Sequence, residues 1–132
     1  MAEILHAHQL IQLAQSLTRM QSAITDYELH HYGELSTAQK LRLEETLTLL
    51  ATAAGRMYAY SVQLIFQDAE TQLQQLKQAT EELKKFLRTT EKIQQVLDIV
   101  DSIASLADSI ISHDVEGITA GIDQIIQMMG NN

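Results

Sequence analysis

The sequence contains no cysteine, proline or tryptophan, and only five of its 132 residues are glycine. Without cysteine, the chain has no disulfide framework, no thiolate metal site and no cysteine nucleophile. Folds built from β-strands need frequent turns, and glycine and proline supply most of them. Their scarcity argues against all-β and α/β folds. It predicts one all-α domain over residues 1–132.

Positive charge is also scarce, and its distribution is uneven. The net charge is −8, and residues 91–132 contain seven acidic side chains against Lys92 alone. Phosphate backbones and anionic lipid headgroups repel such a segment, so nucleic-acid binding is not expected and membrane binding is disfavoured. The first residues lack the basic and apolar regions of a secretory signal, so we expect a cytoplasmic protein.

Apolar residues recur at helical spacing through most of the chain. This periodicity predicts helices over about 2–31, 36–88, 91–111 and 115–129. The expected architecture is an elongated helical bundle: a long antiparallel helical hairpin with heptad packing of the coiled-coil type and a short C-terminal helix. Gly33 is expected to end the first helix with a positive φ.

The boundaries of the second helix rest on different signals. Ser36 and Gln39 have the spacing of a capping box, which predicts a helix start at Thr37. An apolar seam then continues with a 3.5-residue period past residue 100, and a single helix of that length would be about 115 Å long. The chain must therefore fold back. We place the break at Thr89, with a break near Asp68 as the alternative.

The second predicted helix is apolar around much of its circumference between residues 47 and 66, so it needs cover on more than one side. This predicts a non-catalytic interaction or assembly module. Its partner is another protein or a second copy, with a homodimer favoured. The expected interaction surface comprises Leu49, Tyr58, Tyr60, Val62 and Phe66.

Two alternative functions remain open. Residues 46–66 contain one charged residue, Arg56, so a toxin-like protein could conceal this segment and insert it into a membrane. A metal-binding bundle is the second alternative, because Glu-x-x-His spacing occurs twice. The candidate ligands are Glu3, His6, Glu28 and His31.

No sequence signal predicts catalysis. The sequence has no glycine-rich phosphate loop and no nucleotide-binding fingerprint, and no base lies beside a serine to activate it. We therefore expect no enzyme activity, no cofactor and no small-molecule substrate.

Overall fold

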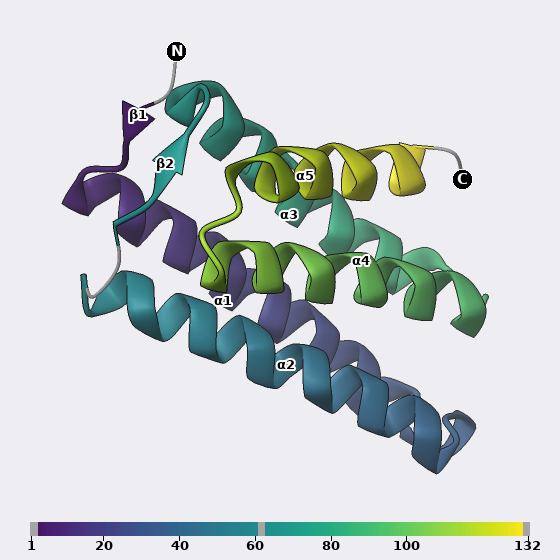
Figure 1. Ribbon diagram of the computed structural model, residues 1–132. Helices are drawn as coiled ribbons and strands as arrows, with labels where there is room; N and C mark the ends of the chain where they lie inside the picture. Colours follow the sequence, from purple (N-terminus) through teal and green to yellow (C-terminus); the bar gives the residue numbers. More distant parts are fainter. Residues whose placement is uncertain (1–2, 61–62, 131–132) are drawn as a thin grey trace.

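The computed structural model describes residues 3–60 and 63–130 and shows an all-α bundle (Figure 1). The helices in these residues are α1 (Ala7–His30), α2 (Thr37–Tyr58), α3 (Ala69–Thr89), α4 (Ile93–Ile111) and α5 (Val115–Gly130). The other elements are two short strands, β1 (Glu3–Ile4) and β2 (Ile65–Phe66), and a 3-10 turn, η1 (Tyr32–Glu34). The predicted fold class is confirmed.

The helices form a closed ring in which each one packs against two main neighbours. The order around the ring is α1, α2, α4, α5 and α3, and α3 packs against α1 again. At one end, which we call the hairpin end, α1 leads through η1 into α2, and α3 turns into α4 (Figure 1). At the opposite end, β1 pairs with β2 and α4 turns into α5. We call this the strand end.

The predicted seam of α1 is buried in the core. Leu13, Leu17, Met20 and Ile24 have no exposed surface, because α2 and α3 cover this face. The prediction for the first helix is wrong at its start, since residues 3–4 form a strand and α1 begins at Ala7.

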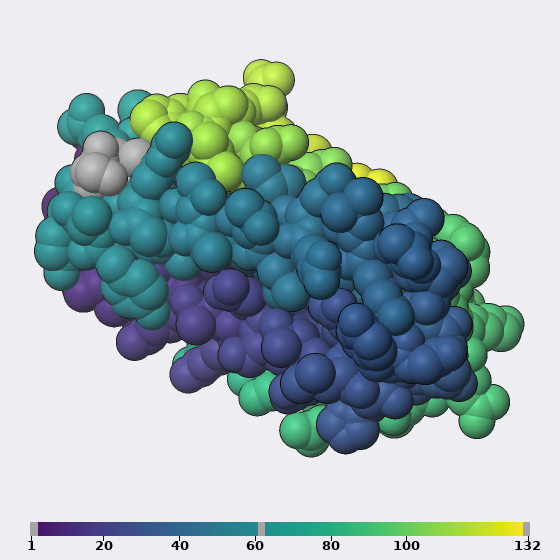
Figure 2. Space-filling view, turned by 90° about the horizontal axis from the view of Figure 1, so that it is seen from below, coloured from purple at the N-terminus to yellow at the C-terminus, as the bar shows by residue number. Residues whose placement is uncertain are grey.

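The most enclosed helix is α4, not α2. In α4, nine of 19 residues are buried, whereas six of 22 are buried in α2. The sequence predicted that the apolar stretch of the second helix lies either at the centre of the bundle or in an oligomer interface, and the structure does not place it at the centre. α2 crosses one face of the molecule beside α1, with much of its length visible (Figure 2). Ala51 and Thr52 lie on the outer side of α2. Their side chains are small, so their exposure to water costs little free energy.

Local capping signals correctly predict two helix starts. The Gln39 amide donates to the Ser36 hydroxyl at 3.1 Å, and the Ser36 amide donates to the Gln39 side-chain oxygen at 2.8 Å. At α5, the Gly117 amide donates to an Asp114 carboxylate oxygen at 3.1 Å. The bonds from the Gln39 and Gly117 amides satisfy donors that have no partner within the first turn of a helix.

The predicted helix 36–88 is interrupted. α2 ends at Tyr58, and α3 begins at Ala69 after the Asp68 carboxylate accepts a bond from the Thr71 amide at 3.2 Å. Between them, β2 pairs antiparallel with β1, so that Ile4 faces Ile65. The chain also turns after Thr89. Both break positions suggested by the sequence are therefore used, and the long seam is not one continuous helix.

The connection after α2 and the one after α4 both use positive φ without glycine. Tyr60 has a φ of 52° and His113 a φ of 61°, and no described glycine has a positive φ. The expectation for Gly33 is therefore wrong, because Gly33 lies within η1. At the end of α4, the amides of His113 and Asp114 donate back to the carbonyls of Ile110 and Ser109. These two bonds form a Schellman motif.

Candidate interaction surface

Large exposed apolar side chains occur only at the two ends of the bundle within the described part of the chain. Three lie at the hairpin end and four at the strand end. Those at the hairpin end are Leu29, Tyr32 and Leu41, and those at the strand end are Ile4, Tyr58, Tyr60 and Ile65. The long faces between the ends carry smaller or polar groups at their exposed positions. This distribution makes the ends the candidate sites for association.

The four residues at the strand end define what we call the strand-end patch: Ile4, Tyr58, Tyr60 and Ile65. Their exposed fractions lie between 41% and 54%. Ile4 and Ile65 are direct partners across the two-stranded ladder, which places their side chains on the same face of it. Tyr58 and Tyr60 come from the end of α2, which lies at the same end of the bundle (Figure 1).

The backbone on both sides of this patch is anchored in the core. The Leu5 amide donates to the Leu64 carbonyl at 2.8 Å, and both side chains are buried. Phe66, the last residue of β2, has no exposed surface. Because alternate residues of a strand point to opposite sides, burial of Leu64 and Phe66 turns Ile65 outward. The core therefore positions the patch.

Tyr60 occupies the left-handed region, which is costly for a bulky side chain. An L-residue pays about 1–2 kcal/mol in this conformation, and glycine avoids most of that cost. The amides of Ala59 and Tyr60 donate to the carbonyls of Gly55 and Met57, and these bonds close the end of α2. The turn thus keeps an exposed aromatic ring where glycine would be the more stable residue.

The structure separates the five residues of the predicted interaction surface. Tyr58 and Tyr60 are exposed and belong to the strand-end patch. Leu49 is half-buried in the middle of α2, and Val62 lies outside the described residues. Phe66 is a correction: it is a core residue, because pairing of β2 with β1 turns its side chain inward.

Sequence reasoning missed Ile4 and Ile65. Both occur in apolar stretches that we assigned to helices, and nothing local indicates that residue 4 pairs with residue 65. Ile65 is exposed between two buried residues, Leu64 and Phe66, and such alternation of exposure is typical of a strand. All three residues are apolar, so no alternation of polar and apolar residues in the sequence indicates the strand.

The hairpin end presents its apolar residues differently. The Lys40 ammonium lies 3.5 Å from the centroid of the Tyr32 ring, an arrangement that attracts the cation to the ring face. This contact covers part of the ring of Tyr32. Leu29 and Leu41 project from α1 and α2 close to the same turn.

A groove of about 640 Å³ lies between α1 and α3 at the hairpin end. Tyr27, His30, Lys84 and Arg88 are among its lining residues. α1 and α3 both end here, and helix C-termini carry partial negative charge. The cations of Lys84 and Arg88 compensate this charge. Burial, together with the negative charge of Glu34, raises the pKa of the Tyr27 hydroxyl.

The candidate metal ligands lie at opposite ends of α1. Glu3 and His6 are at the strand end, whereas Glu28 and His31 are at the hairpin end. The His31 ring lies 2.6 Å from a Glu34 oxygen and stacks on Tyr27. No group of three or more His, Cys, Asp or Glu residues able to hold a metal occurs within residues 3–60 and 63–130.

Glu28 is a carboxylate with little access to water. It is 8% exposed, and it lies where α1 packs against α2. Burial raises the pKa of the Glu28 carboxyl, and repulsion from Glu44 adds to the increase, while Lys40 opposes it. This environment penalises the ionised form of Glu28.

Residues 46–66 do not form one helix, since α2 ends at Tyr58 and the segment continues into β2. Within the described residues, no helix is long and apolar enough to cross a membrane.

Comparisons with protein-family models, curated proteins and solved structures found no match for this chain.

Proposed function

We propose that this chain is a non-catalytic protein-interaction module that binds its partner through the strand-end patch. The observation that carries the proposal is the placement of the exposed apolar side chains. Four of them gather at one end, on a turn and a ladder that the core holds in place. Scattered exposed apolar residues are ordinary, but a group at one site is typical of a binding surface.

The composition of the patch supports the same function. Tyrosine is enriched in protein interfaces, because its ring buries a large area and its hydroxyl tolerates a wet rim. Tyr60 adds a second argument, since its φ of 52° is strained. Strained residues cluster at functional sites, where the surrounding structure holds them. Binding of a partner gives the strained, exposed ring of Tyr60 a role that stability alone does not.

The strand-end patch can accept several classes of partner. The patch fits an amphipathic helix, an extended segment or a second copy of the chain, and the homodimer predicted from the sequence is one of these cases. The proposed role of this surface is protein binding, and it involves no catalytic step, cofactor or small-molecule substrate.

Site-specific photo-cross-linking in cells that naturally produce the chain tests the assigned surface. A photoreactive amino acid replaces Tyr58 in one variant and Ile65 in another, and the matched control carries it at Thr52, an exposed residue in the middle of α2. We expect discrete protein adducts from positions 58 and 65 and none from position 52. Absence of adducts at 58 and 65, or an identical adduct pattern from all three positions, would contradict the proposal.

A further inference from the structure

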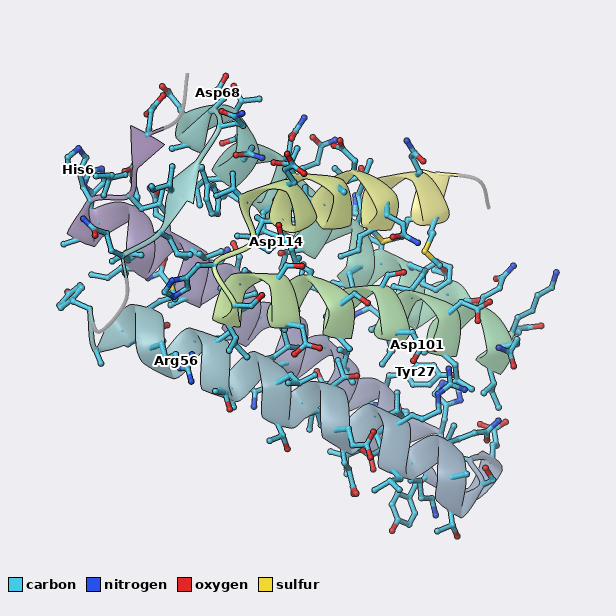
Figure 3. The ribbon with its side chains drawn as sticks, in the orientation of Figure 1. His6, Tyr27, Arg56, Asp68, Asp101 and Asp114 are labelled. Carbon is cyan, nitrogen blue, oxygen red and sulfur yellow. The ribbon has the colours of Figure 1, made fainter. Side chains whose placement is uncertain are left out.

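Exposed carboxylates lie at the same end of the bundle as the strand-end patch. Three of the segments that meet at this end contribute at least one: β1, the turn into α3, and the turn from α4 into α5. Asp68 and Asp114 are labelled in Figure 3. The residues are Glu3, Asp68, Glu70, Asp114 and Glu116, and all five are exposed. Asp68 and Asp114 cap helices, whereas the other three carboxylates make no hydrogen bond or ion pair with any residue that the structure describes.

Positive charge is nearly absent from the strand end. Its one arginine, Arg56, donates to the Ile111 carbonyl at 3.4 Å and so helps to hold α2 against α4. Lys77 in α3 and Arg19 in α1 line one groove together with Glu70. The other four lysines lie farther from this end, at Lys40 in α2 and from Lys84 to Lys92 along α3 and the turn after it. The exposed charged side chains at the strand end are therefore mainly acidic.

From this combination, we propose that the strand-end patch binds a cationic amphipathic segment of another protein. Its apolar side chains contact Ile4, Ile65 and the two tyrosines, and its lysine or arginine side chains face the carboxylates at the strand end. This inference rests on the proposed function and adds the chemistry of the partner. Complementary charge around an apolar centre accelerates association and excludes partners of the wrong sign.

The same charges disfavour a symmetric homodimer through this surface. A two-fold contact brings the same surface of both copies together, so each set of carboxylates would face its equivalent. Glu3 and Asp68 are closest in sequence to the patch residues Ile4 and Ile65, and two copies would double this charge at the interface. Like charges in contact across an interface lower affinity. A cationic partner removes this repulsion.

Binding of two designed helical peptides provides the test. One peptide carries leucine on one face and lysine on the other, and the second replaces every lysine by glutamate. We expect saturable binding of the lysine peptide, measured by isothermal titration calorimetry, and no measurable binding of the glutamate peptide. Raising the sodium chloride concentration from about 50 to about 500 mM should weaken binding by about tenfold or more, because salt screens exposed charges.

Matched variants then localise the site. Neutralising the three free carboxylates with Glu3→Gln, Glu70→Gln and Glu116→Gln should weaken binding about fivefold to tenfold. The control has the same net charge but carries Glu44→Gln, Glu45→Gln and Glu91→Gln at the hairpin end. It should bind like the unmodified chain. Tyr58→Ala and Ile65→Ala should each weaken binding about tenfold, whereas Leu41→Ala should not.

All of these side chains are exposed, so the variants should fold, and circular dichroism verifies this. Equal binding of the two peptides would overturn the inference, as would equal weakening by the two triple variants. Dimerisation of the free chain that Tyr58→Ala abolishes would also overturn it, because the occupant is then a second copy. In each of these cases, cross-linking at positions 58 and 65 still tests separately whether the strand-end patch binds a protein.

Discussion

Both ends of the bundle expose large apolar side chains, three at the hairpin end and four at the strand end, but the two ends are built by different means. At the hairpin end, a capping box and a short 3-10 turn join helices that follow each other directly in the sequence. At the strand end, residues 3–4 meet residues 65–66, and both described non-glycine residues with positive φ lie there. The hairpin end is thus stabilised locally, while long-range pairing and strained turns form the strand end. The strand end is therefore the better candidate for a surface shaped by binding.

The largest expected effect comes from removing the anchor of the strand end. Phe66→Ala should lower the free energy of unfolding by about 3–5 kcal/mol, because it leaves a cavity beneath the β1–β2 ladder. Tyr32→Ala, at an exposed aromatic residue of the hairpin end, should cost less than about 1 kcal/mol. Urea denaturation measures both. Similar losses from the two changes would show that long-range packing does not hold the strand end.

The local origin of the hairpin end can be tested at its cap. Ser36→Ala should lower the free energy of unfolding by about 1 kcal/mol, since the Gln39 amide loses its partner. Thr48→Ala in the exposed middle of α2 is the control and should change stability by less than about 0.5 kcal/mol. If Ser36→Ala has no effect in the same urea titrations, the capping box does not determine this end.

Relief of strain should strengthen the strand end. His113→Gly should raise the free energy of unfolding by about 0.5–1 kcal/mol, because glycine adopts the φ of 61° without steric cost. Thermal unfolding followed by circular dichroism measures the gain. The control is Tyr32→Gly at the hairpin end, where φ is not positive and glycine should be destabilising. A loss of stability from His113→Gly would show that the turn after α4 is not strained.

The smallest effect concerns the buried carboxylate near the hairpin end. Burial raises the pKa of Glu28, so the ionised form is disfavoured and its cost to stability grows as the pH rises through the range where Glu28 titrates. Glu28→Gln should therefore raise the free energy of unfolding slightly at neutral pH. The gain should shrink as the pH falls, because native Glu28 becomes protonated and neutral.

Urea titrations at several pH values provide the measurement, and Glu45→Gln, at an exposed carboxylate, is the control. A gain from Glu28→Gln that is the same at acid and neutral pH would show that the charge of Glu28 is not its cause.

Sequence periodicity predicted most of the helical segments, but the sequence predicted only some of the helix ends. The start of α2, the break after Thr89 and the range of α5 follow from neighbouring residues, and the structure confirms them. The break after Tyr58 is different, because Ala59 and Tyr60 carry no glycine or proline signal. The heptad seam continues through this region by apolar composition alone. Composition cannot distinguish a buried strand from a buried helix when every residue is apolar.

The same limit applies to the candidate site. Tyr58 and Tyr60 were identified from the sequence because they lie on the apolar flank of the second predicted helix, whereas Phe66 was assigned to the same surface and lies in the core. Ile65 has the opposite exposure to its two neighbours, and only the partner strand determines which side faces water. A shift of one residue in register would exchange these faces.

The sequence by itself determined that this protein is helical, where α2 and α5 begin and which face of α1 is buried, because these properties depend on residues within about a turn of one another. Tertiary structure alone decided that α4 is the most enclosed helix, that residues 59–60 and 63–68 lie outside the helices, and that Ile4 lies opposite Ile65. These properties arise from packing and hydrogen bonds between segments about 60 residues apart. The strand-end patch belongs to this second group, since its residues come together only when the bundle closes.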